Sequence, residues 1–117
     1  MQLDIWKKGN TLVVALKGEL DHHTAAGCRE RIDNALLRPG IRNLILDLSE
    51  LAFMDSSGIG VILGRYRTVT RRGGKMAAMH IQPEVMRIFR MAGLEGIIPV
   101  CGGTDDAIRI FERERMA

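Results

Sequence analysis

The sequence predicts an α/β protein whose sheet is mostly parallel with an antiparallel first strand, covered by four helices in the order β-β-α-β-α-β-α-β-α. Apolar runs typical of strands alternate with segments of helical spacing, and this alternation favours a parallel sheet with right-handed crossovers. The run at 41–51, IRNLILDLSEL, is too continuously apolar for a strand with one face in water. A chain of 117 residues is long enough for one core, so we expect residues 1–117 to form a single domain.

The first half of the chain predicts a hairpin, a helix and a central strand. Residues 11–20, TLVVALKGEL, are rich in β-branched side chains, and LDIW at 3–6 predicts the antiparallel partner of that strand. From Thr24 the apolar residues recur at helical spacing, until Arg-Pro-Gly at 38–40 breaks the pattern. The run at 41–51 then predicts a central parallel strand.

Residues 53–66, FMDSSGIGVILGRY, predict the change from that strand into a second helix. The helix is expected to end at Gly73-Gly74, and KMAAMHI at 75–81 predicts a further parallel strand. The apolar stripe of the helix consists of Ile59, Ile62, Leu63, Tyr66 and Val69.

The last third of the chain predicts two helices separated by a short strand. Pro83 suits the first turn of a helix, and Gly93 is expected to end it. The run GIIPV at 96–100 predicts a last strand, which Pro99 weakens and so places near an edge. A final helix is expected from Thr104 onward.

Composition and charge exclude several classes of protein. Hydrophobic residues make up 46% and charged residues 26%, which is typical of a folded, soluble domain. No apolar run approaches the roughly 18 residues of a membrane span, and the N-terminus lacks the order of a secretory signal, so we expect a cytoplasmic protein without membrane contact. Cys28 and Cys101 lack C-x-x-C spacing and are expected to be reduced thiols without a role.

The excess of basic residues is small, with a net charge of +3. Its densest part lies late in the second predicted helix and just beyond it, where cations face the negative end of the helix dipole. Because no aromatic residues interleave with these charges, we interpret them as a solvated helix end and expect no direct binding of nucleic acid. The cluster consists of Arg65, Arg67, Arg71, Arg72 and Lys75.

Two loops with unusual residues follow neighbouring predicted strands. GELDHHTA at 18–25 and FMDSSG at 53–58 would meet at one edge of the sheet, because functional loops gather at the carboxyl ends of parallel strands. Asp21, His22 and Ser56 would then lie together. The ordinary interpretation of Asp-Ser-Ser at a helix start is a cap for free N–H groups. A cap needs only one of the three side chains, however, and nearby glycines keep the corner open.

A hydroxyl at a helix N-terminus could also accept a phosphate without unfolding the helix. Phosphorylation would add about −1.5 to −2 charges beside free N–H donors, which the helix dipole favours. With Asp55 adjacent, a partner that accepts the neutral serine would then face a dense anionic cluster.

Rival chemistries find less support. SSGIGVILG has the look of a dinucleotide loop, but the position about 20 residues on, where an acid should hold the ribose, falls near His80. A P-loop and a Gly-x-Ser-x-Gly elbow are absent, although Asp21, His22 and Ser56 could still form a convergent triad. The adjacent histidines cannot easily share a metal. We therefore expect no catalytic residues, cofactor or metal.

The two loops together closely resemble the bacterial anti-sigma factor antagonists of the STAS domain family. GELDHHTA at 18–25 and FMDSSGIGVILGRY at 53–66 carry the resemblance; the Asp-Ser-Ser-Gly-Ile-Gly core is typical of the family, and the Asp-His-His segment is similar to its sporulation members. The resemblance extends over essentially the whole chain and is thin over 1–12 and 101–117.

The resemblance implies a regulatory role. In this family the first serine of the Asp-Ser-Ser-Gly motif is phosphorylated by the anti-sigma factor, an ATP-dependent protein kinase, and a PP2C-type phosphatase reverses the reaction. It therefore implies that Ser56 is the phosphoacceptor and that the unphosphorylated chain binds the anti-sigma factor, releasing the sporulation sigma factor. The chain would be a substrate and binding module and not an enzyme.

The resemblance and the predicted loop positions together indicate a contact surface for the anti-sigma factor. Asp55 and Ser57 would shape and cap it, and the Gly-Ile-Gly segment would present a flat, partly apolar area. Because no long exposed apolar edge is evident, we expect a monomer when the chain is alone. The expected contact residues are Asp21, His22, Asp55, Ser56, Ser57, Gly58, Ile59 and Gly60.

Overall fold

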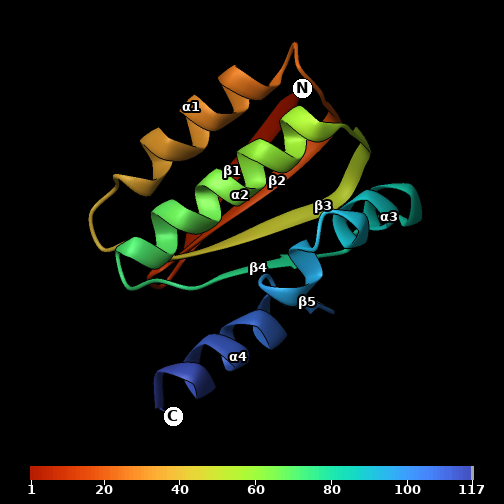
Figure 1. The fold of residues 1–117 in the computed structure, drawn as a ribbon. Coiled ribbons are helices and arrows are strands. Elements are labelled where there is room, and N and C mark those ends of the chain that lie inside the picture. The colour runs from red at the N-terminus through yellow and green to blue at the C-terminus, as the bar shows by residue number, and fades with distance from the viewer. Residues whose placement is uncertain (117) are drawn as a thin grey trace.

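A computed structural model describes residues 1–116, in which five strands form one sheet in the order β1-β2-β3-β4-β5 (Figure 1). β1 pairs antiparallel with β2, and the other neighbouring strands pair parallel. The predicted fold class, including the antiparallel first strand, is therefore confirmed. The strands are β1 (Gln2–Lys8), β2 (Thr11–Leu20), β3 (Asn43–Met54), β4 (Met76–Met79) and β5 (Val100–Cys101).

Helices cover both faces of the sheet. Two of them, α1 and α2, lie side by side on one face, and α4 lies on the opposite face (Figure 1). No helix in the described part of the chain is both long and apolar enough to cross a membrane. The helices are α1 (Ala25–Leu36), α2 (Ser56–Arg71), α3 (Pro83–Met91) and α4 (Thr104–Met116), with a short 3-10 helix η1 (Leu94–Gly96) after α3.

The alternation of side chains along the strands explains the continuous apolar runs in the sequence. Successive strand residues point to opposite faces, so Leu12 and Val14 of β2 join the large core beneath α1, α2 and α3, while Val13 joins a smaller core with Phe111 of α4. All three of these β2 residues are fully buried. The stretch of β2 that is buried on both faces, from Leu12 to Leu16, is therefore continuously apolar.

The last strand differs from the prediction of 96–100. Gly93 takes a left-handed conformation with φ 75° and ends α3, and the chain then forms η1, so that β5 begins only at Val100. Pro99 cannot donate a hydrogen bond, but its carbonyl oxygen accepts one from the N–H of Ala78 at 2.9 Å. Ile98 fills the core from a turn and not from a strand, whereas Ile97 and Val100 on either side of it are exposed.

Arg65 corrects the interpretation of the basic cluster as wholly solvated. Its side chain is only 8% exposed and its Nε lies 3.0 Å from Oδ1 of Asp33 on α1. The two atoms are within ion-pair distance, although their geometry is not that of a hydrogen bond. Arg65 therefore links α1 to α2. Arg67 and Arg71 are exposed, as expected of a solvated helix end. Arg72 is also exposed but donates hydrogen bonds to the carbonyl oxygens of Leu36 and Ile41, and Lys75 is half-buried and forms an ion pair with Glu114.

Candidate functional site

The two loops singled out from the sequence meet at one edge of the sheet. β2 and β3 are parallel neighbours whose pairing continues to Leu20 opposite Met54, the last residue of each strand. Just beyond this pair, the N–H of Asp55 donates to the carbonyl oxygen of Leu20 at 3.3 Å. The predicted proximity of the loops is therefore confirmed. β3 also ends three residues later than the predicted 41–51, so Asp55 lies directly after the last residue of the strand, at this edge of the sheet.

Asp55 is the cap of α2. Its backbone is extended, and its Oδ1 accepts hydrogen bonds from the N–H groups of Ser57 at 2.8 Å and Gly58 at 3.3 Å. Ser56 is exposed, and its hydroxyl makes no hydrogen bond with any residue that the structure describes. One side chain thus satisfies the helix end, and the neighbouring hydroxyl is left accessible in the first turn.

The two glycines that follow have different surroundings. Gly58 is buried, and a Cβ there would lie 2.5 Å from Cγ of Met54 and 2.8 Å from the carbonyl oxygen of Leu20. Gly58 therefore lets α2 approach the ends of β2 and β3, and it does not offer the open surface expected of it. Gly60 is exposed, and a Cβ there would meet nothing within 4 Å. Ile59 between them is half-buried against the core.

The β2–α1 loop is held by Asp21. Its Oδ1 accepts hydrogen bonds from the N–H groups of His23 at 2.8 Å and Thr24 at 3.1 Å, and the Thr24 hydroxyl donates to the carbonyl oxygen of Glu19 at 2.8 Å. Partial desolvation alone would raise the pKa of Asp21, but the two backbone donors outweigh it and lower the pKa overall. Asp21 thus carries a negative charge on the same edge as Asp55.

The two histidines lie at the tip of this loop. Their ring centroids are 4.5 Å apart in an edge-to-face arrangement, and both side chains are exposed. Within the described residues, no hydrogen bond connects the side chains of Asp21, His22 and Ser56, so the arrangement does not have the geometry of a catalytic triad. Residues 1–116 also hold no group of three His, Cys, Asp or Glu side chains placed to bind a metal ion.

A depression between α1 and α2 adds a feature that the sequence did not reveal. It has a volume of about 340 Å³ and opens beside the exposed side of α2. Small residues on both helices create it, and the pair Ala25-Ala26 opposite Gly60 was the only signal for it in the sequence. The exposed ring of Phe53 is a second apolar feature near Asp55. The depression is lined by Ala25, Ala26, Arg29, Ser57, Gly60 and Val61.

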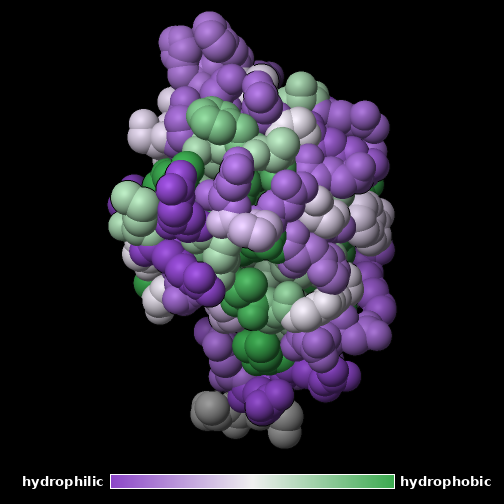
Figure 2. Space-filling model, turned by 90° about the vertical axis from the view of Figure 1, so that its right-hand side faces the viewer, coloured by the Kyte–Doolittle hydropathy of each residue, from purple (hydrophilic) through white to green (hydrophobic). Residues whose placement is uncertain are grey.

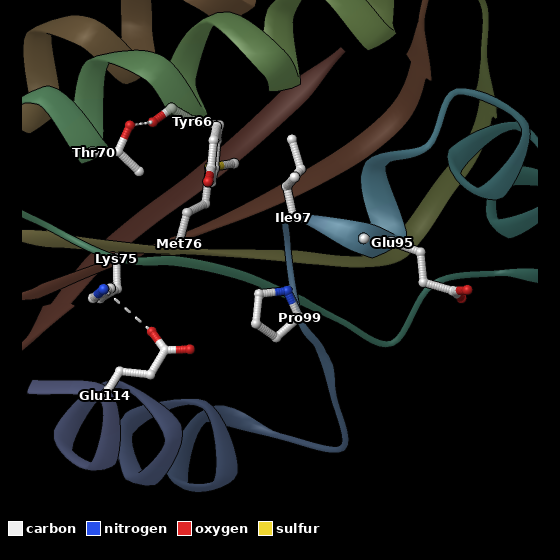
Figure 3. A pocket seen from close by; sticks show the side chains of 9 residues that line it. Tyr66, Thr70, Lys75, Met76, Glu95, Ile97, Pro99 and Glu114 are labelled. Carbon is white, nitrogen blue, oxygen red and sulfur yellow. Dashed lines mark hydrogen bonds and ion pairs between the residues drawn. The ribbon is translucent and has the colours of Figure 1, made fainter. Parts of the chain in front are cut away.

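A larger cavity lies elsewhere. It has a volume of about 540 Å³ and lies between α2, the turn after α3 and α4, where Lys75 and Glu114 form an ion pair at 3.5 Å (Figure 3). Tyr66 and Met76 line the same cavity. None of the residues expected to contact a partner takes part in it, so size alone does not locate the candidate site.

On the face that carries α3, apolar residues form small patches separated by hydrophilic residues (Figure 2).

Comparison with known proteins places the chain in a family. The STAS domain family matches residues 2–112, so the chain belongs to the STAS domain family. Within that family it is 40% identical over 112 residues to the anti-sigma F factor antagonist of Paenibacillus polymyxa, an alignment that covers 96% of each chain.

Two solved structures of one anti-sigma factor antagonist are also similar. The unphosphorylated form of SpoIIAA has a TM-score of 0.79 and 30% identity, covering 99% of this chain and 98% of its own. The phosphorylated form of the Bacillus cell fate determinant SpoIIAA has a TM-score of 0.72 and 28% identity, covering 93% and 99%. The same fold thus accommodates both states in that relative.

Proposed function

We propose that this protein is an anti-sigma factor antagonist that is switched by phosphorylation of Ser56. The observation that supports the proposal is that, at the start of α2, one residue caps the helix and a different one presents an exposed hydroxyl. Asp55 caps the helix through Ser57 and Gly58, and the exposed Ser56 hydroxyl makes no hydrogen bond with the residues that the structure describes. A kinase can therefore modify Ser56 without disturbing a contact that holds the helix in place.

The effect of the phosphate would be electrostatic. It would add about −1.5 to −2 charges to an edge that already carries Asp21 and Asp55. The N–H group of Ser56, which has no acceptor among the described residues, and the dipole of the first turn favour an anion there, so the helix would remain intact. A partner surface that fits the neutral edge would then face several like charges, which weakens binding by on the order of 100-fold or more.

The proposed partner is the anti-sigma factor that phosphorylates the chain with ATP. Binding of the unphosphorylated chain would release the sporulation sigma factor, and a PP2C-type phosphatase would restore binding competence. The relatives named anti-sigma F factor antagonist and the phosphorylated SpoIIAA structure support this assignment. The chain itself would act as a monomeric, cytoplasmic binding module and not as an enzyme.

The proposed contact surface centres on Ser56. Asp21 and His22 border it from the β2–α1 loop, and Ile59 and Gly60 extend it along the exposed side of α2. Asp55 and Ser57 would contribute at the helix start, while Gly58 acts from beneath, by allowing α2 to approach Leu20.

The test is incubation with ATP and the cognate anti-sigma factor, followed by mass mapping of the phosphate and by a binding titration. The wild type and the matched control Ser57→Ala should each gain one phosphate on Ser56 and lose binding. Ser56→Ala should bind and stay unmodified, and Ser56→Asp should bind poorly. A phosphate on another residue, or equal binding of the modified and unmodified forms, would contradict the proposal.

Stability measurements separate this role from that of a mere cap. Asp55→Ala should lower the free energy of unfolding by about 0.5–2 kcal/mol, because the N–H groups of Ser57 and Gly58 lose their acceptor. Ser56→Ala should change it by less than about 0.5 kcal/mol. Urea unfolding of both variants provides the comparison, and a larger loss for Ser56→Ala would mean that Ser56 has a structural role.

A further inference from the structure

The end of the sheet opposite Ser56 carries a second surface depression, built from three segments far apart in the sequence. They are the β1–β2 turn, the loop before β3 and the residue after α2, and the volume between them is about 460 Å³. The 12 residues of β3 separate this end from Ser56 by roughly 35 Å. The depression is lined by Asn10, Gly40, Ile41, Arg42 and Arg72.

The Gly73-Gly74 turn fixes Arg42 in this depression. Its Nε donates to the carbonyl oxygen of Gly73 at 3.2 Å. A Cβ on Gly73 would lie 3.1 Å from Nη2 of Arg42, and a Cβ on Gly74 would collide with the carbonyl oxygen of Arg42. Both glycines thus leave space that Arg42 occupies, one for its guanidinium and one for its backbone.

Arg72 is fixed by the end of α1. Its Nη2 donates to the carbonyl oxygen of Leu36 at 2.9 Å and reaches that of Ile41 at 3.5 Å. Both arginines are therefore held by backbone carbonyls from other elements, and their guanidinium groups need little further ordering to bind a ligand.

These contacts do not use up the donors or the charge of the two arginines. A guanidinium has five N–H donors, and only a minority of them bond to the carbonyls named above. Neither arginine forms an ion pair with a carboxylate among the described residues, and both are exposed. The ends of α1 and α2 offer about half a negative charge each, which is less than two guanidinium charges.

We propose that this depression binds the phosphate group of a small soluble compound, such as inorganic phosphate or a phosphate monoester. Two fixed guanidinium groups offer the forked donor geometry that phosphate oxygens accept. Among the described residues no acidic side chain lines this depression, and Glu112 and Glu114 line the adjoining one on the other side of Arg42. The proposal is independent of the switch at Ser56, because the two sites lie at opposite ends of the sheet. Helix capping by itself would account for the contacts of the two arginines but predicts no affinity for phosphate.

The test is to titrate the full chain with inorganic phosphate, and separately with glycerol phosphate, at constant ionic strength. The chemical shifts of the backbone amides are recorded by NMR at each addition. Saturable shifts are expected at Asn10, Gly40 and Gly73, while sodium chloride should produce none that saturate. Arg42→Gln and Arg72→Gln should each weaken binding by roughly tenfold or more, since each removes charge-assisted hydrogen bonds. Arg87→Gln on α3 is the matched control, because Arg87 is also exposed, and it should bind like the wild type.

Arg42→Lys and Arg72→Lys guard against variants that fail to fold. Both variants keep the positive charge but lose the planar guanidinium that can donate two parallel hydrogen bonds. They should therefore fold, and they should bind phosphate several-fold more weakly than the wild type. Ser56→Ala should bind phosphate like the wild type, which keeps this test separate from that of the switch. Shifts that do not saturate, or affinities unchanged in both glutamine variants, would overturn the proposal.

Discussion

Gly58 and Gly60 offer a matched pair of substitutions at the start of α2. In a helix, alanine is more favourable than glycine by about 1 kcal/mol, so both changes to alanine gain the same free energy from helix propensity. What differs is the space around the new methyl group. At Gly60 it would meet no atom within 4 Å, and at Gly58 it would lie 2.5 Å from Cγ of Met54.

The structure therefore predicts opposite signs. Gly60→Ala should raise the free energy of unfolding by about 0.5–1 kcal/mol. Gly58→Ala should lower it by about 1–2 kcal/mol net, because the methyl group would also lie 2.8 Å from the Leu20 carbonyl oxygen, a backbone atom that cannot move aside like a side chain. The difference of about 1.5–3 kcal/mol corresponds to roughly 6–12 °C in Tm for a domain of this size.

Urea unfolding followed by the fluorescence of Trp6 measures both values. Trp6 is the one tryptophan of the chain and lies on β1, away from either substitution. The slope of the transition should stay constant, so that a change in midpoint reports a change in stability. If Gly58→Ala proved as stable as Gly60→Ala, the close packing of α2 on Leu20 and Met54 would be refuted.

Two further predictions concern buried groups. Asp33→Ala should lower the free energy of unfolding by about 1–3 kcal/mol, because it leaves the charge of Arg65 buried without its partner. Arg65→Met removes the buried charge itself and should lower the free energy of unfolding by less. Urea unfolding of both variants checks this order, and a larger loss for Arg65→Met would contradict it. Burial raises the pKa of the Cys28 thiol to about 11, from 9.0 in an exposed thiol. The contribution of the neutral Cys28 thiol to the free energy of unfolding is therefore fully present below pH 9. It declines as the pH rises towards 11, because the thiol ionises in the unfolded chain at a lower pH than in the folded protein. Between pH 8 and pH 10 the wild type should lose about 1 kcal/mol more than Cys28→Ala, and equal losses in urea unfolding would show that Cys28 ionises as readily in the folded state.

The sequence predicted the elements better than their ends. Hydrophobic periodicity indicated each helix and the two long parallel strands, because burial on one or both faces leaves a direct trace in residue type. The last strand was misplaced because Ile97 and Ile98 look like strand residues, while the left-handed Gly93 and the non-donating Pro99 set the backbone. Apolar residue type therefore does not distinguish a turn from a strand, and here it marks one buried residue, Ile98, beside an exposed one, Ile97.

The candidate site could be located from the sequence, but not resolved into roles. Asp55 and Ser57 were both expected to shape and cap the start of the helix, but in the structure the capping side chain is that of Asp55, Ser57 only donates its N–H group to it, and Ser56 is the exposed serine. Arg65 was missed for a related reason. Its burial depends on Asp33, 32 positions earlier, and charge patterning within one helix carries no information about such a partner.

The exposed, unbonded hydroxyl of Ser56 has a consequence for the lifetime of the protein in the cell. The proposed phosphate there would alter folding stability by only about 1 kcal/mol, since the hydroxyl makes no hydrogen bond with the described residues. Proteases that act on transiently unfolded chains would then clear the two forms at comparable rates. The ratio of the forms would be set by the enzymes that add and remove the phosphate, and a cell could keep a standing reserve of the inactive form without losing it to degradation.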